Sequence, residues 1–375
     1  MKTRVLLFVL VVSCLSFGCK KDGENILGKS TESQIVLSTY SSNLSSAAVL
    51  AVLDKNANSI MERTVTTAAI NFKKWEVNGK TRYTYMEFDP KVKQLTPGIL
   101  PTTGILLDEN YKEIKRIRLV TNNGRTLADP TSIDAHDLIY LDDNHFITLA
   151  YFQKPVNNIP VALKPAANCQ VVAPIIQETL NDQVVFEWDG TNYPELYTQS
   201  VEGNAFSNAS VVHDYIHMNS IYIDPTDDNL ICSMRNLNQV IKINRRDGHI
   251  MWRLGGSNSD FAMTPQMKFL RQHNATLTDN NQTLLIYDNG HATERPYTRV
   301  VEFHLNPEAK TVDAFKAFTL PNNIFSQYMG SVQKRGDTYF ISCGSEPKIL
   351  EVNYVTNQIN LLLNLPNVSY RALKY

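Results

Sequence analysis

Residues 240–256 read VIKINRRDGHIMWRLGG, which is an apolar strand-like run, a polar turn with Asp247 and Gly248, and a second β-rich run. Asn, Asp and Gly are the residues that tight turns between paired strands require. Five other stretches repeat the arrangement, and the six turns fall near Asp54, Asp108, Asn181, Asn244, Asn306 and Asn353. Successive turns are 54, 73, 63, 62 and 47 residues apart, the length of one four-stranded sheet with its loops.

A single sheet of this size cannot bury both of its faces, so the six units must pack against one another. Radial stacking of such sheets gives a β-propeller. Helical periodicity is nearly absent beyond the first residues of the chain. The sequence therefore predicts an all-β fold, a six-bladed β-propeller.

Between the repeated hairpins lie the segments that would supply the inner strands of the blades. Four of them are DAHDLIYLDDNHFITLAY, YIHMNSIYIDPTDDNLICSMR, QHNATLTDNNQTLLIYDNG and YMGSVQKRGDTYFISCG. The innermost strands of a propeller line its central channel, and their first residues meet at one mouth. Three of these segments open with His136, His217 and His273, and the fourth opens with Ser331. We therefore expect the three histidines to converge on one axis.

The stretch VVHDYIHMNS raises a metal site as another explanation, because His213 and His217 have the spacing of the zinc motif H-E-x-x-H. The glutamate of that motif is missing. If Tyr215 to Ile223 form a strand, as their composition indicates, the two imidazoles lie roughly 13 Å apart. One ion cannot bridge that distance, so we predict no metal.

The start of the chain, MKTRVLLFVLVVSCLSFGC, has the pattern of an export signal. A basic region with Lys2 and Arg4 precedes an apolar run that is too short to span a bilayer. Gly18 and Cys19 resemble a lipoprotein cleavage site, with lipid attached to Cys19. We expect a signal peptide at 1–18, an anchor and linker at 19–34 and the propeller at 35–375. An ordinary secretory signal is the alternative.

Composition restricts the partners and the redox chemistry. The formal net charge of -1 offers no basic surface for nucleic acid, so no nucleic-acid partner is predicted. After the leader and anchor, Cys169, Cys232 and Cys343 remain, and no C-x-x-C pair argues for zinc. With the signal and Cys19, these features predict an exported lipoprotein of the outer membrane, facing the periplasm or the cell surface and held only by its lipid.

The segment HDYIHMNSIYIDPTDDNLICSMRNLNQVIKINRRDGHIMWRLGG, at 213–256, resembles the bacterial arylsulfotransferases that use aryl sulfates and no nucleotide sulfate donor. DAHDLIYL before it, RQHNATL and LLIYDNG after it, and the closing YRALKY extend the resemblance over the mature chain. The resemblance implies a six-bladed propeller that moves a sulfuryl group from an aryl sulfate to a phenol by a ping-pong route. No cofactor is implied.

The resemblance also assigns roles to residues. His273 matches the nucleophile that becomes transiently sulfated, and His217 and Arg235 match groups that hold the sulfuryl oxygens. His136 matches the fourth member of the catalytic set. The residues implied in substrate binding are Asn219, Asp288 and Asn289.

One position departs from the family pattern. Asn274 follows His273 where the resemblance leads us to expect an aspartate, and losing a carboxylate that tunes the imidazole would weaken it as a nucleophile. Two other functions stay open: an inactive, lipid-anchored propeller that binds an anionic or aromatic ligand or a protein, and a hydrolase in which water replaces the phenol. A scaffold has no need for three histidines and an arginine around one channel, which favours the transferase.

Overall fold

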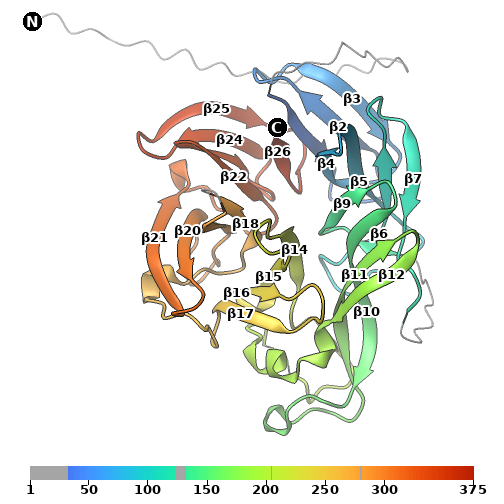
Figure 1. Ribbon diagram of the computed structural model, residues 1–375, viewed down its shortest axis with the longest axis vertical. Coiled ribbons are helices and arrows are strands. Elements are labelled where there is room, and N and C mark those ends of the chain that lie inside the picture. Colours follow the sequence, from blue (N-terminus) through green and yellow to red (C-terminus); the bar gives the residue numbers. More distant parts are fainter. Residues whose placement is uncertain (1–32, 123–131, 204, 279–280) are drawn as a thin grey trace, which may run out of the picture.

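The computed structural model describes residues 33–122, 132–203, 205–278 and 281–375. The signal peptide predicted at 1–18, Cys19 and nearly all of the linker lie outside the described residues. Within the described part, the regular structure is β apart from short 3-10 turns, and six sheets surround a common axis (Figure 1). The prediction of an all-β, six-bladed propeller is confirmed. No helix among the described residues has the length and apolarity needed to cross a membrane.

Each blade runs outward from the axis in chain order. The strands of the first three blades are β1 (Ile35–Thr39), β2 (Ala48–Leu53) and β3 (Ser59–Val65); β4 (Ala69–Val77), β5 (Lys80–Phe88), β6 (Pro101–Leu107) and β7 (Glu113–Ile117); and β9 (Leu138–Asp142), β10 (His145–Val156), β11 (Cys169–Leu180) and β12 (Gln183–Asp189).

The remaining three blades follow the same plan. Their strands are β14 (Met218–Ile223), β15 (Leu230–Met234), β16 (Gln239–Ile243) and β17 (Ile250–Gly255); β18 (His273–Thr278), β19 (Thr283–Asp288), β20 (Arg299–Asn306) and β21 (Thr311–Thr319); and β22 (Ser331–Arg335), β23 (Thr338–Ser342), β24 (Lys348–Asn353) and β25 (Gln358–Asn364). The stretch at 240–256 forms β16 and β17, with Val240 opposite Leu254. The repeated hairpins are thus the outer strand pairs of the blades.

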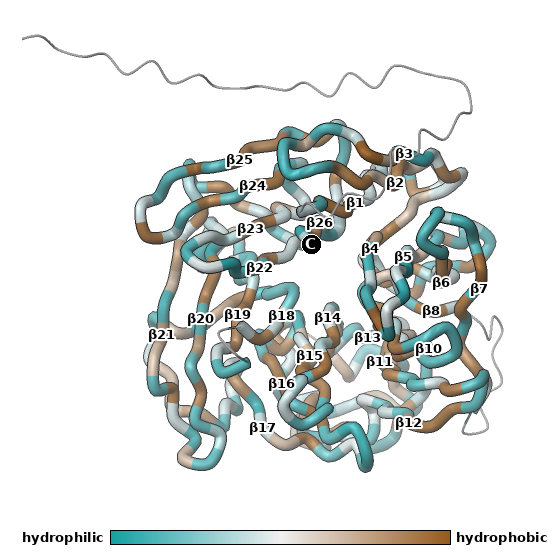
Figure 2. Tube along the Cα trace, turned by 45° about the horizontal axis from the view of Figure 1, so that its top comes forward, coloured by the Kyte–Doolittle hydropathy of each residue, from teal (hydrophilic) through white to brown (hydrophobic). Residues whose placement is uncertain are grey.

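The ring is closed by the end of the chain. Strand β26 (Ala372–Lys374) is the innermost strand of the first blade and pairs with β1, with Leu37 opposite Ala372. Gln34 and Tyr375 exchange two backbone hydrogen bonds of 3.0 and 2.8 Å. Both views of the molecule place the C-terminus beside β26 (Figures 1 and 2). The two ends of the propeller therefore hold each other.

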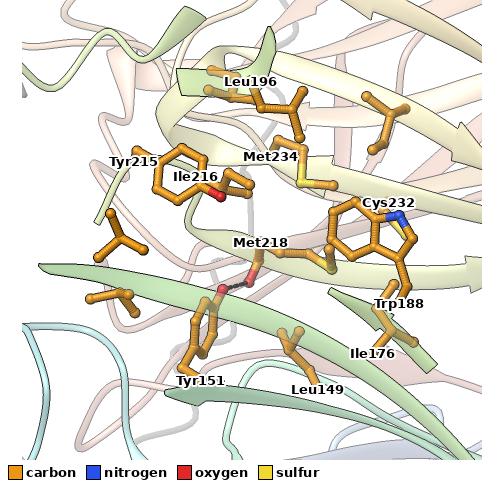
Figure 3. Packing of buried hydrophobic residues seen from close by; sticks show 14 of the residues in the cluster. Leu149, Tyr151, Ile176, Trp188, Leu196, Tyr215, Ile216, Met218, Cys232 and Met234 are labelled. Carbon is orange, nitrogen blue, oxygen red and sulfur yellow. Dashed lines mark hydrogen bonds between the residues drawn. The ribbon is translucent and has the colours of Figure 1, made fainter. Parts of the chain in front are cut away.

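The hydrophobic core lies between neighbouring blades. Between the third and fourth blades, Trp188 packs with Cys232 and Met234, and all three are nearly or fully buried (Figure 3). The Tyr151 hydroxyl donates a 2.5 Å hydrogen bond to the Met218 carbonyl across the same interface. The three described cysteines are free and buried. This packing fixes the angle between blades, and so fixes where the inner strands begin.

Three inner strands carry an extra residue near their start, and in each case it is an asparagine. Asn71, Asn219 and Asn274 sit at breaks in the β4–β5, β14–β15 and β18–β19 registers. Such bulges redirect side chains. The Asn71 amide donates to the His136 carbonyl at 2.9 Å, and the Asn219 amide donates to the Gln272 carbonyl at 2.8 Å. These two bonds connect each blade to the following one, close to His136 and His273.

Candidate active site

A cavity of about 1060 Å³ opens at the mouth where the inner strands begin. His136, His217 and His273 line it together with Arg235. The structure thus brings into one cavity the four residues to which the sequence analysis assigned catalysis. The rest of the lining is largely apolar and aromatic, and includes Tyr40, Leu100, Val212, Tyr328, Met329 and Tyr370. Such a lining suits a ligand with an aromatic ring and one charged group.

Arg235 lies beside His217 because the β14–β15 hairpin reverses the chain and brings Arg235 back to the end of the blade where β14 begins. Strands β14 and β15 pair with Met218 opposite Met234, and the Arg235 amide then donates to the His217 carbonyl at 2.9 Å. The guanidinium donates through Nη1 to Asn236 Oδ1 at 2.8 Å and to Glu202 Oε1 at 3.1 Å.

Strand β14 begins at Met218, so the strand predicted from Tyr215 was too long at its start.

A second hairpin brings Asn289 back to His273 in the same way. The Asn289 amide nitrogen donates to the carbonyls of Ser326 and Met329, each at 2.8 Å, and this fixes Oδ1 as the atom 2.9 Å from His273 Nδ1. A carbonyl oxygen only accepts, so His273 carries its proton on Nδ1. Nε2 is left with its lone pair, and the Met329 amide donates to it at 3.3 Å.

The other two imidazoles are each held by a carboxylate. His136 Nδ1 bonds Asp134 Oδ1, and His217 Nδ1 lies 2.6 Å from Asp214 Oδ2. These bonds fix the ring orientation and direct Nε2 away from the carboxylate. The two rings meet edge to face with their centroids 4.9 Å apart. Sequence reasoning missed both carboxylates as site residues, although each stands two or three positions before its histidine.

A family model supplies the decisive comparison: the one described as Arylsulfotransferase (ASST) matches residues 104–359. The chain belongs to the arylsulfotransferase family. The matched range contains His136, His217, His273 and Arg235. No curated protein matches the chain significantly.

Solved structures resemble the arylsulfotransferase chain only distantly. A Bacteroides caccae protein of unknown function has 9% identity and a TM-score of 0.47, with 92% of this chain and 99% of that one covered. Apo AztD from Citrobacter koseri has 7% identity and a TM-score of 0.43, with 92% and 98% covered. Likenesses of this degree carry no functional argument.

The surroundings of His273 shift the pKa of its imidazole. Burial and the nearby Arg235 charge hold the pKa of this imidazole well below its usual value, and the hydrogen bond to Asn289 opposes them only in part. His273 is therefore neutral at physiological pH, which a nitrogen nucleophile requires.

A buried charge cluster lies next to Tyr370, one of the residues that line the cavity, and faces a second pocket. Arg371 donates to Asp137 Oδ2 at 3.0 Å and to the Asn219 carbonyl at 2.9 Å, and Lys73 pairs with the other Asp137 oxygen. Burial alone would raise the pKa of Asp137, but Arg371 and Lys73 keep it below its usual value. The Tyr370 hydroxyl donates to the Asn219 carbonyl at 3.0 Å. The cluster fastens the end of the chain to the third and fourth blades.

The three residues predicted to bind substrate are not part of the cavity lining. Asn219, Asp288 and Asn289 are fully buried, and none of them lines the cavity. Asn219 anchors the backbone before His273, and Asn289 orients the His273 ring. Asp288 accepts bonds from Arg295, Arg299 and the Leu270 amide. The bulge and hairpin geometry turns all three side chains into the protein, and each holds other residues of the site or its surroundings.

Two further residues singled out in the sequence are held by other contacts, and one of them, His213, also lines the cavity. Asn274 accepts a 3.1 Å bond from the Val332 amide and takes no part in holding the His273 imidazole. His213 packs against Phe206, with ring centroids 5.0 Å apart. In the part of the chain that the structure describes, no group of three or more metal-binding side chains occurs. Asn274, which stands where an aspartate was expected, therefore makes a hydrogen bond to the neighbouring blade, and the partner of the His273 imidazole is Asn289.

Proposed function

We propose that the protein transfers a sulfuryl group from an aryl sulfate to a phenol through a sulfated His273. The observation that carries the proposal is the state of this side chain. Its Nδ1–H is fixed by Asn289, so Nε2 carries the lone pair that would attack once its long 3.3 Å bond from the Met329 amide is given up, and Arg235 and two carboxylate-held imidazoles line the same cavity. Family membership supports sulfotransferase chemistry in general.

In the first half-reaction, the lone pair on His273 Nε2 attacks sulfur and the bond from sulfur to the aryl oxygen breaks. The Nδ1 proton stays in place, so the sulfated ring is cationic and remains bonded to Asn289. The guanidinium of Arg235 donates to the sulfuryl oxygens as their charge redistributes, and His217 does so through Nε2–H in its cationic form, in which both ring nitrogens carry a proton and Asp214 balances the charge. The phenolate leaves into the aromatic part of the cavity.

In the second half-reaction, a phenol takes the place of the departed one and its oxygen attacks sulfur. The bond between sulfur and Nε2 breaks, and His273 returns to its neutral form. The phenol proton goes to Nε2 of an unprotonated imidazole, for which His136 is suited because Asp134 holds its Nδ1. Transfer in these two steps needs positioning and charge stabilisation rather than a cofactor.

The test is a steady-state assay with 4-nitrophenyl sulfate as donor and phenol as acceptor. We expect nitrophenol release that depends on phenol, with parallel lines in double-reciprocal plots against donor at several phenol concentrations. Release at the same rate without phenol would identify a hydrolase instead. No release with any of several aryl sulfates would favour a binding propeller.

We further propose that the chain is exported and lipidated on Cys19, which the basic and apolar pattern of residues 1–18 supports. Cells expressing the protein and fed a labelled fatty acid should label the parent but not Cys19→Ser. Label on both proteins, or on neither, would contradict the anchor.

A further inference from the structure

A carboxylate occupies the position next to the arginine that the proposed mechanism uses to bind sulfate. Glu202 Oε1 lies 3.1 Å from Arg235 Nη1 and 3.3 Å from Arg271 Nε. Glu202 lines the cavity, and the sulfate of an aryl sulfate is an anion that guanidinium groups recognise in the same way. One carboxylate therefore bridges two arginines at the place where an anionic substrate group is needed.

Among the described residues, Arg271 forms its ion pair with this carboxylate, and its surroundings are unusual for an arginine. It is 7% exposed, its backbone is left-handed with φ of 54°, and it does not line the cavity that Glu202 lines. Its Nη1 has no hydrogen-bond partner, and Nη2 makes only a 3.5 Å contact with the Val201 carbonyl. A buried guanidinium with an unused donor is costly unless an anion completes its bonding.

Glu202, in contrast, is free to move. Its side chain is 35% exposed, and Gly203 follows it with a positive φ of 61° and nothing within 4 Å of a Cβ built on it. A change of side-chain rotamer is enough to carry the carboxylate into solvent. Arg271 would then face the cavity beside Arg235.

We infer that Glu202 is a built-in competitor for the sulfate group of the donor, and that Arg271 is a second arginine of the anion site, uncovered when Glu202 swings out. The inference rests on the proposed function for its ligand. Glu202 thereby sets donor specificity: a weakly held or uncharged group cannot displace it, whereas a sulfate that bonds both arginines can. When the site is empty, the Glu202 carboxylate offsets one of the two guanidinium charges, which leaves a net positive charge to attract the donor.

The experiment measures binding of inorganic sulfate to the purified protein by isothermal titration calorimetry, so it needs no turnover. Glu202→Gln should bind sulfate about three to ten times more tightly than the parent, the range expected when a partly exposed carboxylate stops competing for a guanidinium. Adding Arg271→Met should remove the gain. Arg271→Lys, which keeps the charge, should retain part of it and serves if the Met variant does not fold. Glu195→Gln is the matched control, because Glu195 pairs with Arg253 at 2.8 Å away from the cavity lining and should bind sulfate as the parent does.

Steady-state kinetics distinguish a carboxylate that competes with sulfate from one that only holds the Arg235 side chain in position. As a competitor, Glu202→Gln should lower KM for an aryl sulfate by a similar factor and leave kcat within about twofold of the parent. Unchanged or weaker sulfate binding in Glu202→Gln, a gain that survives Arg271→Met, or no sulfate binding by any variant would overturn the inference. Sulfate binding in the expected order by a protein that releases no phenol would instead contradict the proposed transferase and leave the anion site standing.

Discussion

Replacing Asn289 with leucine tests the claim that a fixed tautomer makes His273 a nucleophile. The side chain of Asn289 makes three hydrogen bonds, to His273 Nδ1 and to the carbonyls of Ser326 and Met329. Leucine has nearly the same shape and makes none of them. Because three buried groups then lose their partner at about 1–3 kcal/mol each, the variant should lose at least roughly 3 kcal/mol of unfolding free energy. It should still fold, which urea unfolding will show.

The effect on the reaction follows from the Nδ1 proton. Without its acceptor, the buried Nδ1–H is unsatisfied at a cost of about 1–3 kcal/mol, which favours moving the proton to Nε2 and lowers the reactive fraction roughly 5- to 150-fold. The assay is the first turnover of 4-nitrophenyl sulfate without acceptor, followed by stopped flow. The rate constant at saturation should fall by that factor, while donor affinity changes little because Asn289 does not line the cavity.

Asn229→Leu is the control for losing a buried amide. Its Oδ1 accepts a 3.0 Å bond from the Arg245 amide in a turn far along the blade from the site. We expect a loss of about 1 kcal/mol in stability and no change in the first-turnover rate. If Asn289→Leu folds and reacts within twofold of the parent, or if its only defect is weak donor binding, the tautomer argument is wrong.

Four further predictions follow from the same geometry. Asp214→Asn should lower kcat about 10- to 100-fold by releasing the His217 ring, and unchanged kcat in the steady-state assay would show that the carboxylate is not needed. Gly98→Ala should raise the donor KM, because Gly98 has φ of 92° and an added Cβ would lie 3.2 Å from His217 Cε1; a variant with parental KM contradicts this. Because the pKa of His273 is lowered, its labelled imidazole should show no NMR titration step near pH 6.5, and a step there would mean that the ring is protonated in the resting protein. Asp137→Asn should destabilise the fold by about 3–5 kcal/mol at pH 7, since it leaves two buried cations unpaired. The depressed Asp137 pKa contributes stability that is present above about pH 4 and lost as pH falls through the folded-state value, so the variant should also lose this part of the acid sensitivity in urea unfolding.

Local features of the fold could be read from the sequence because they repeat. The six hairpin turns carry Asp, Asn or Gly at a regular spacing, and they became the outer strand pairs, as β16 and β17 show. Ring closure could not be read in this way. Strand β26 is only three residues long, and its partner β1 lies at the other end of the chain, so no local pattern marks the pairing.

The same distinction holds at the candidate site. The three histidines could be placed because each opens an inner segment, and the structure gathers them in one cavity. The roles of Asn219 and Asn289 depend on a bulge and on which atom of an amide faces inward, and spacing does not encode either. Glu202 comes from a connecting loop with no repeat, so only the folded structure brings it to Arg235.

Trapping the sulfated enzyme tests the central claim most directly. The protein is mixed with an excess of 4-nitrophenyl sulfate without acceptor, quenched under conditions that preserve the N–S bond, digested and mapped by mass spectrometry, and a second portion is chased with phenol before quenching. We predict one added SO3 group on the peptide with His273, at this residue, which disappears in the chase as phenyl sulfate forms, and none in His273→Asn. Turnover with no sulfated residue, a sulfate on another side chain, or a label that phenol does not remove would contradict the mechanism.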